Sequence, residues 1–195
     1  MKKLYLQAFP KSERKPFRLM RKKAREGVME LLVIDEKKEL LGLAITVRYK
    51  DMVLLDYFAV ETGHRGKKIG SCALELLKQR YKDCRFMLEI ELPETEGPGQ
   101  DLRIRRKQFY LRNGMKETGI KVCLFLVPME LLTDGKAVSF EEYYALYEHT
   151  IGPAFARKVE RLAEKKEMQN REKKEESHES RKCAREERRT DRGNP

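Results

Sequence analysis

The sequence predicts an α/β domain followed by a highly charged extension. Three apolar runs separated by short charged turns indicate a sheet that begins as an antiparallel meander (29–60). The chain then passes from strand to glycine-rich turn to helix (52–83), so strands and helices share one fold. From about residue 157 charged residues dominate and apolar ones become rare. We therefore expect a folded domain over 1–156 and, over 157–195, a helical start followed by disorder.

The first half of the chain supplies helix and strand signals in a clear order. Residues 13–27 are expected to form a helix, because apolar side chains recur at helical spacing and a glycine follows as a stop. The next apolar runs are divided by charged turns at 35–38 and 49–51, which predicts three antiparallel strands. A second helix is predicted over 71–83, where apolar side chains again follow helical spacing.

The second half continues to alternate strand and helix. A strand at 85–94 is followed by a Gly/Pro loop and by a helix at 101–114, which ends at an Asn-Gly pair. Strand residues at 121–132 are expected to break at Pro128. An amphipathic helix is predicted at 139–149, with a serine N-cap and a glutamate three residues later, the pattern of a capping box.

The net charge of +11 is concentrated at the two ends of the chain. Residues 1–25 hold ten Lys/Arg against one acid, residues 157–195 carry +4, and residues 26–156 carry −2. A basic segment attracts a nucleotide-bearing cofactor as readily as RNA, so charge does not choose between these ligands. The sequence has no apolar run long enough for a membrane span and no apolar stretch typical of a signal peptide. We therefore expect a cytoplasmic protein that does not enter a membrane.

The four cysteines do not predict a structural site. Cys72, Cys84, Cys123 and Cys183 lie far apart and form no CxxC pair. Three of them fall within apolar or helical patterns, where reduced, buried thiols are ordinary. We expect neither a disulfide framework nor a metal site.

The segment after the third predicted strand carries the strongest functional signal. Gly63, Gly66 and Gly70 lie in a turn that leads directly into a helix. Glycines allow a sharp turn and a close approach of ligand to backbone, and a helix N-terminus directs free N–H groups at an anion. Basic residues in the same turn add positive charge. The pattern predicts a pyrophosphate cradle, although neither a Walker loop nor a GxGxxG dinucleotide pattern is present.

Two segments together resemble a known family. Arg65-Gly66-Lys67-Lys68-Ile69-Gly70 resembles the acyl-CoA signature of the GNAT superfamily of N-acyltransferases, R/Q-x-x-G-x-G/A, but with Lys68 where glycine is usual. The segment FYLRNGMKETG (109–119) is similar to the family's FYxxxGFxxxG segment. The two occur in the family's order with a strand between them, and the resemblance covers roughly residues 1–133.

The resemblance implies a GNAT-like fold, with a mixed, mostly antiparallel central sheet flanked by helices and two neighbouring strands splayed to admit the pantetheine arm of acetyl-CoA. It also implies a set of contacts with this co-substrate. The expected contacts are backbone groups of Phe58, Ala59 and Val60, and the cradle of Arg65, Gly66, Lys67, Lys68, Ile69, Gly70 and Ser71. Arg103 stands where the family often has an asparagine that contacts the cofactor, so Arg103 or Arg106 is expected to serve phosphate instead.

The resemblance implies an N-acetyltransferase in which a primary amine attacks acetyl-CoA directly in a ternary complex. Tyr110 matches the family's general acid, which protonates the departing thiolate. For the base, strand alternation places Glu89 and Glu91 on one face, and Asp56 alternates with its neighbours on the adjacent strand. Carboxylates in apolar strands are costly unless paired or functional, so any of the three is a candidate. Glu91, nearest the strand end, is the first choice and Glu89 the second.

Other functions remain open at the level of sequence. A protein of this fold could bind acyl-CoA as a sensor or interaction module without catalysis. An RNA-directed acetyltransferase that uses the basic residues of 1–25 ranks third, because no RNA-binding motif is present. The acidic candidates favour a cationic amine as acceptor, whether a small molecule such as a polyamine or amino sugar, or a peptide N-terminus. Both a monomer and a homodimer are compatible with the sequence.

Overall fold

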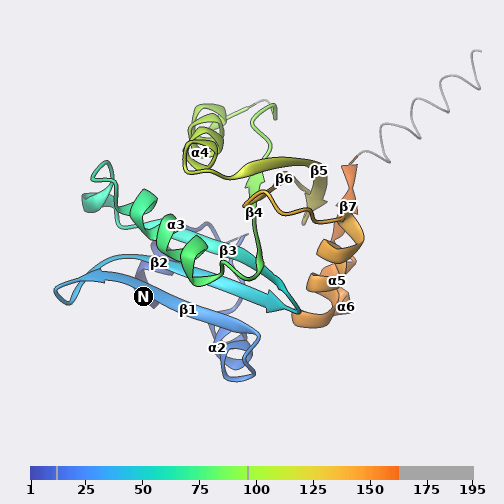
Figure 1. Ribbon diagram of the computed structural model, residues 1–195, viewed down its shortest axis with the longest axis horizontal. Coiled ribbons are helices and arrows are strands. Elements are labelled where there is room, and N and C mark those ends of the chain that lie inside the picture. Colours follow the sequence, from blue (N-terminus) through green and yellow to red (C-terminus); the bar gives the residue numbers. More distant parts are fainter. Residues whose placement is uncertain (12, 96, 163–195) are drawn as a thin grey trace, which may run out of the picture. The chain divides into compact units, whose positions relative to one another are not determined.

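A mixed sheet organises the computed structural model, which describes residues 1–162 except 12 and 96 (Figure 1). The strands that it describes follow the spatial order β1-β2-β3-β4-β6-β5-β7. The β3–β4 pair is parallel, whereas β1–β2, β2–β3, β4–β6 and β5–β6 are antiparallel, which confirms a mixed, mostly antiparallel sheet. The strands are β1 (Met29–Glu36), β2 (Glu39–Tyr49), β3 (Met52–Val60), β4 (Arg85–Glu91), β5 (Lys116–Leu124), β6 (Val127–Thr133) and β7 (Val159–Arg161).

Helices cover both faces of the sheet and enclose a core on each. In Figure 1, α3 lies above strands β1 to β3 and α2 below them. One core joins the sheet to α1, α2 and α5, and the other joins it to α3 and α4. The helices are α1 (Lys2–Ala8), α2 (Phe17–Arg25), α3 (Ile69–Arg80), α4 (Gln100–Arg112), α5 (Phe140–Thr150) and α6 (Pro153–Ala156).

The four predicted helices are confirmed, with ends shifted by a few residues, but α1 was not predicted. Its Leu4 and Tyr5 are buried, yet a helix of seven residues is too short to show a repeating apolar pattern. The capping box of α5 is confirmed: the Ser139 side chain accepts a hydrogen bond from the Glu142 N–H, and the Glu142 side chain accepts one from the Ser139 N–H. This box fixes the start of α5.

The meander and its turns are confirmed, whereas the expected break at Pro128 is wrong. Pro128 lies inside β6 and pairs with Cys123. The chain reverses earlier, at Phe125 and Leu126, whose φ angles of 49° and 70° suit a two-residue hairpin turn. Proline is tolerated near the start of a strand, and the Pro128 carbonyl still accepts a hydrogen bond from the Leu92 N–H at 2.9 Å.

The expected splay between two neighbouring strands occurs between β3 and β4. Their parallel pairing runs only from Met52 with Arg85 to Leu55 with Leu88, although β3 continues to Val60 and β4 to Glu91. A β-bulge marks the point of divergence. On β2, Ile45 pairs with Tyr57 and the next residue pairs with Leu55, so Asp56 is left without a partner. A bulge bends its strand and increases the local twist, and this explains why β3 turns away from β4 here.

Most of the predicted charged extension lies outside the described residues. In the described part of the extension, Val159–Arg161 forms the short strand β7, so a helical start directly after residue 156 is wrong. Residues 163–195, which include Cys183, lie outside the described residues, and the expectation of disorder stays a prediction there. Residues 1–160 form one compact unit. Within the described residues, no helix combines the length and the apolar character needed to cross a membrane.

Candidate active site

The turn between β3 and α3 has the backbone shape that its glycines suggested. After a short 3₁₀ turn (Thr62–His64), Gly66 adopts φ +80° and Lys68 adopts φ +61°, and α3 begins at the next residue. Lys68 is the position at which the resembling signature usually has glycine. A left-handed φ is strained by about 1 kcal/mol for a residue with a side chain, which explains that preference. In this chain the lysine adopts the conformation despite this strain.

The first turn of α3 offers amides to a ligand. The N–H groups of Ile69, Gly70 and Ser71 precede the first intrahelical hydrogen bonds, and no side chain caps the helix. Hydrogen bonding of the helix begins at Cys72, whose N–H donates to the Lys68 carbonyl at 3.0 Å. Free amides and the positive end of the helix dipole are suited to an anionic ligand at this turn.

Most charged side chains of the turn reach solvent. Arg65 and Lys67 are exposed, and the Arg65 Nε donates to the last carbonyl of β3 at 3.2 Å. His64, in contrast, lies between two carboxylates: Nε2 is 3.1 Å from Glu39 and Nδ1 is 3.2 Å from Glu61. His64 therefore stabilises the turn through its contacts with Glu39 and Glu61, while Arg65 and Lys67 give the turn its positive surface.

The free edge of β3 presents alternate backbone groups to the gap beside β4. A Cβ atom on Gly42 of β2 would lie 2.6 Å from the Ala59 carbonyl oxygen, so that carbonyl faces β2. Backbone groups alternate in direction along a strand, and those of Phe58 and Val60 therefore face the gap. This favours Phe58 and Val60 over Ala59 as backbone partners of a ligand in the gap.

Two aromatic residues of α4 close the same side of the gap. A Cβ on Gly70 would lie 3.3 Å from the Phe109 ring, so this glycine permits close packing of α3 against α4. Tyr110 is only 8% exposed and lies in the core beneath α3 and α4. Burial raises the pKa of Tyr110 to about 12, so its hydroxyl keeps its proton at neutral pH. No described residue forms a hydrogen bond with this hydroxyl, which leaves it available as a donor.

Glu89 lies on the opposite face of the sheet, in a cluster of phenols and one ion pair. Its Oε1 accepts hydrogen bonds from the hydroxyls of Tyr143 (2.6 Å) and Tyr147 (2.8 Å), both on α5. No described residue donates to its Oε2. Burial raises the pKa of Glu89, and the nearby carboxylate of Asp56 adds to the increase, while the Tyr143 hydrogen bond and Lys15 act against it. A carboxylate with a raised pKa and a free oxygen is suited to accept a proton.

Glu91 has a different environment from Glu89. Its carboxylate is 3.0 Å from Arg106 and 3.8 Å from Arg103, so two cations neutralise it. Arg103 also donates to the Pro98 carbonyl at 3.1 Å and to the Thr95 carbonyl, and it thereby holds the loop before α4. Both arginines expected to serve phosphate are engaged with protein groups, and the geometry favours Glu89 over Glu91 as a base.

The expected alternation around Asp56 is wrong because of the bulge. Simple alternation places Leu55 and Tyr57 on one face, but they belong to the two different cores. The unpaired Asp56 shifts the pattern by one residue and directs its carboxylate toward Lys15, at 2.7 Å. Asp56 and Glu89 are therefore close enough to interact electrostatically.

Three residues of this cluster were missed in the sequence. Lys15 lies among many lysines and arginines, and nothing in its surroundings sets it apart. Tyr143 and Tyr147 do carry a signal, because they are spaced four residues apart and so share one face of their helix. That face could have been predicted to meet the sheet, but its carboxylate partner could not.

The chain belongs to the GNAT family of acetyltransferases. The family model described as "Acetyltransferase (GNAT) family" matches residues 1–105, more than half of the sequence. This agrees with the diverging strands, the glycine-containing turn and the order of elements in the structure. It confirms the resemblance drawn from the two sequence segments.

Solved structures with the same fold include a GNAT-family acetyltransferase from Bacteroides thetaiotaomicron, described as putative. It is 20% identical, covers 80% of this chain and 90% of its own, and has a TM-score of 0.64. The ribosomal-protein-S18-alanine N-acetyltransferase from Escherichia coli is 15% identical, covers 68% of this chain and 83% of its own, and has a TM-score of 0.50. At these identities the likeness establishes the fold alone. A comparison with curated proteins gives no match.

Proposed function

We propose that the chain transfers the acetyl group of acetyl-CoA to a primary amine by direct attack in a ternary complex. The observation that carries this proposal is the gap between β3 and β4. An anion-binding turn lies at one end of it, Tyr110 on one face of the sheet and Glu89 on the other. A thioester in the gap would be within reach of a proton donor and a proton acceptor from opposite sides.

The residues of the turn and gap fit an acyl-CoA ligand. The amides of Ile69, Gly70 and Ser71, with the exposed Arg65 and Lys67, suit the pyrophosphate group. The pantetheine arm carries amide groups, and these can pair with the gap-facing backbone groups of Phe58 and with the Val60 N–H, as an added strand would. The Val60 carbonyl already accepts a hydrogen bond from the Arg65 Nε. The open space around Gly66 leaves room for phosphate oxygens to approach the backbone.

In the proposed reaction the acceptor binds as an ammonium and loses one proton to Glu89. Its nitrogen lone pair then attacks the thioester carbonyl, the C–N bond forms and the C–S bond breaks. Tyr110 donates its proton to the departing thiolate, and solvent returns a proton to the phenolate. The nitrogen still carries two protons when the C–N bond forms, and it releases one of them to solvent, while Glu89 releases the proton it took. One of these two protons balances the one that solvent returns to Tyr110, so the products are an amide, CoA thiol and one proton. The protonated form of Tyr110 is secured by its raised pKa.

Calorimetry and a CoA-release assay test this proposal together. We expect the full-length protein to bind acetyl-CoA, and to release CoA only when a primary amine from a panel of polyamines, amino sugars and peptides is added. No binding of acetyl-CoA would contradict the proposal. Binding without amine-dependent release across the panel would favour the alternative, a non-catalytic acyl-CoA-binding module of the same fold.

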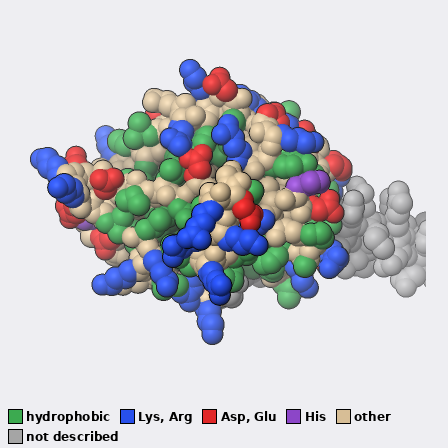
Figure 2. Space-filling model, turned by 90° about the horizontal axis from the view of Figure 1, so that it is seen from below, with side chains coloured by type: hydrophobic (Ala, Val, Ile, Leu, Met, Phe, Trp, Pro, Cys, Tyr) green, Lys and Arg blue, Asp and Glu red, His purple; other side chains and the backbone are tan. Residues whose placement is uncertain are grey.

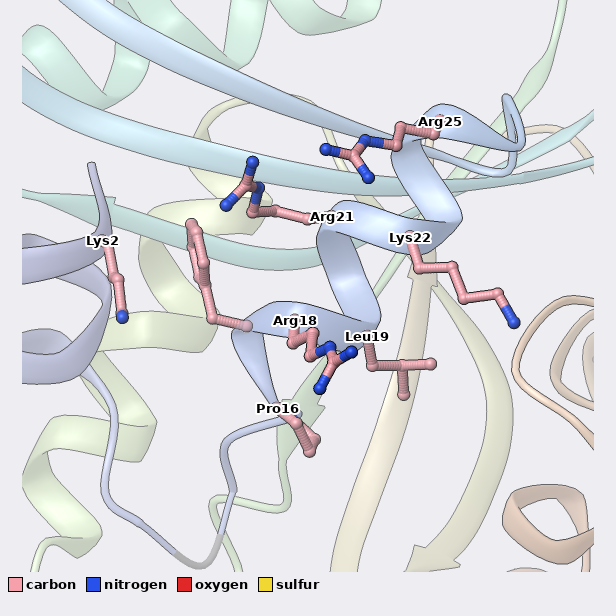
Figure 3. Close-up of a pocket in the computed structure, with 8 residues that line it drawn as sticks. Lys2, Pro16, Arg18, Leu19, Arg21, Lys22 and Arg25 are labelled. Atoms are coloured by element: carbon pink, nitrogen blue, oxygen red, sulfur yellow. The ribbon is translucent and has the colours of Figure 1, made fainter.

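The outer face of α2 supports a second candidate function, action on an acceptor bound to nucleic acid. Arg18, Arg21, Lys22 and Arg25 are all exposed and follow helical spacing, so they form one basic stripe. Figure 2, seen from the side on which α2 lies, shows Lys and Arg side chains gathered on this face. A hollow of about 820 Å³ runs beside the stripe, with Lys2 of α1 alongside (Figure 3).

The charges of this stripe are mostly uncompensated. Among the described residues no carboxylate pairs with Arg18, Arg21 or Arg25, and Lys22 lies 3.8 Å from Glu26. The apolar side of α2 faces the core, where Met20 is fully buried, so the helix does not present an apolar surface to lipid. Arginines in this arrangement suit the phosphates of a nucleic acid.

Fluorescence anisotropy with a labelled RNA, measured over a salt series, tests the second candidate. We expect the variant Arg18→Gln/Arg21→Gln/Arg25→Gln to weaken binding and to reduce the slope of log affinity against log salt by about 2. The matched control is Lys82→Gln/Arg157→Gln/Lys158→Gln, which removes the same charge from exposed positions elsewhere. Equal losses in both variants would contradict a role for the stripe.

A further inference from the structure

Lys15, in the loop between α1 and α2, places its ammonium group beside the candidate base. Its Nζ is 2.7 Å and 2.9 Å from the two carboxylate oxygens of Asp56. The Lys15 side chain is only 9% exposed and that of Asp56 only 4%. An ammonium held so far from water must be compensated by its immediate surroundings. These surroundings therefore form a binding site for an ammonium group.

Aromatic rings complete this ammonium site. The Lys15 Nζ lies 5.2 Å from the centre of the Tyr57 ring and 5.6 Å from that of Tyr147. A carboxylate combined with aromatic faces is a common arrangement for recognising alkylammonium groups. We name Asp56, Tyr57, Glu89 and Tyr147 the ammonium cage.

The backbone around Lys15 is fixed so that its side chain enters the cage. The Lys15 N–H donates to the Tyr57 hydroxyl at 3.0 Å, and that hydroxyl donates to the Glu13 carbonyl at 2.7 Å. The Tyr5 hydroxyl donates to the Lys15 carbonyl at 3.0 Å. The direction of the side chain is thus set by hydrogen bonds on both sides of its backbone.

The cage lies where an acceptor amine would have to be. Asp56 is the bulged residue at which β3 leaves β4, and Tyr147 joins the cage to Glu89 through its hydroxyl. An acceptor amine needs first a site that binds its ammonium form and then a base that removes a proton from it.

We propose that the ammonium of Lys15 occupies the acceptor's own site, and that the acceptor is a primary alkylammonium whose end replaces that of Lys15 in the cage. This inference rests on the proposed N-acetyltransferase function. When an external alkylamine takes this place, it transfers its proton to Glu89, forms its C–N bond with the acetyl carbon and releases CoA, as described above. Lys15 then limits access to the cage and selects amines borne on an unbranched carbon chain, as its own is.

Chemical rescue of a Lys15→Ala variant tests this proposal without knowledge of the natural acceptor. The substitution removes three carbons and the ammonium, which together correspond to n-propylammonium. We expect n-propylammonium chloride, compared with equal sodium chloride, to raise the melting temperature of Lys15→Ala and to leave the wild type unchanged. With acetyl-CoA added, the variant should form N-propylacetamide, detected by mass spectrometry, at least about tenfold faster than the wild type.

Lys107→Ala is the matched control. Lys107 forms an ion pair with Glu117 and with the buried Glu130 at 2.8 Å, on β5 and β6, and β4 separates these strands from the gap. Propylammonium in its place should therefore have no access to the thioester. We expect this variant to form no more N-propylacetamide than the wild type. Product formation by Lys107→Ala equal to that by Lys15→Ala would overturn the proposal.

Acetyl-CoA calorimetry on the same samples separates the two levels of inference. If Lys15→Ala is folded and binds acetyl-CoA but forms no N-propylacetamide, the cage is a structural ion pair and the proposal fails, while the acyl-CoA site stands. If neither protein binds acetyl-CoA, both proposals fail. Lys15→Gln, which retains a donor toward Asp56, is a second variant in case Lys15→Ala does not fold. If Lys15→Gln forms N-propylacetamide no faster than the wild type, this result would also overturn the proposal.

Discussion

The two faces of the sheet meet at the same gap but offer opposite chemistry. On the α3 and α4 side, the gap is bordered by backbone amides, glycines and exposed basic residues. On the α1, α2 and α5 side, it is bordered by carboxylates, phenols and one buried ammonium. The first surface suits an anionic ligand and the second a cationic one. A sheet opened by one bulge can therefore bring two ligands of opposite charge together while keeping their binding sites apart.

The largest expected effect comes from placing negative charge in the turn. We expect Gly66→Glu/Gly70→Glu to weaken acetyl-CoA binding by about 100-fold or more, because carboxylates would repel the phosphates and a Cβ on Gly70 would press on Phe109. Isothermal calorimetry measures this. The control Gly27→Glu/Gly119→Glu adds the same charge at two glycines outside the turn, both with positive φ and open surroundings. Equal losses in both variants would show that charge or strain in general, and not the turn, weakens binding.

The second-largest effect is expected for Glu89, on the opposite face of the sheet. We expect Glu89→Gln to lower kcat by about 100-fold with acetyl-CoA affinity unchanged, whereas Glu91→Gln should change kcat only a few-fold. Because the pKa of Glu89 is raised, kcat/KM of the wild type should fall as the pH falls through that raised value. Steady-state rates over a pH series check this. A larger loss for Glu91→Gln than for Glu89→Gln would reverse the assignment.

The same raised pKa has a consequence for stability with a definite sign. The folded protein binds the Glu89 proton more tightly than the unfolded chain, so the stabilisation is complete below the ordinary glutamate pKa and is lost as the pH rises through the raised value. Glutamine does not titrate, so Glu89→Gln removes this pH-dependent decrease in the free energy of unfolding. Denaturant unfolding of both proteins at acid and neutral pH should show a smaller decrease for the variant.

A smaller effect is expected at Tyr110, on the cofactor side. Tyr110→Phe should lower turnover by about 10-fold or more while leaving acetyl-CoA affinity nearly unchanged, because it removes a proton donor and keeps the buried ring. Comparison of kcat with the calorimetric Kd checks this. Unchanged turnover would exclude the tyrosine as general acid.

The smallest effect concerns the departure from the family's signature. We expect Lys68→Gly to stabilise the protein by about 1 kcal/mol, since glycine adopts φ +61° without strain. Lys67→Gly is the control, because that residue is outside the left-handed region and gains nothing from glycine. Denaturant unfolding distinguishes them. A destabilised Lys68→Gly would mean that the lysine side chain contributes more than its backbone strain costs.

The sequence predicted the α3 and α4 side far better than the other side, and the reason is distance along the chain. Residues 58–71 are consecutive, so their strand, turn and helix could be inferred from glycine positions and apolar spacing. The ammonium cage and its occupant come from segments near residues 15, 56, 89 and 147, and only tertiary packing brings them together. The bulge at Asp56 leaves no sign in the apolar pattern, and it places Leu55 and Tyr57 on opposite faces where simple alternation predicted one face.

The short pairing between β3 and β4 also divides the sheet into two blocks. Among the described strands, the ladder that joins the meander to the strands that follow it has four residue pairs, from Met52 with Arg85 to Leu55 with Leu88. A pantetheine arm bound along Phe58 and Val60 would extend this seam with hydrogen bonds that the polypeptide leaves unmade. Bound acyl-CoA would then act as a structural element that links the two blocks of the sheet and can dissociate. The mechanical coupling between the blocks, and with it the resistance of the chain to unfolding, would rise and fall with the supply of acyl-CoA.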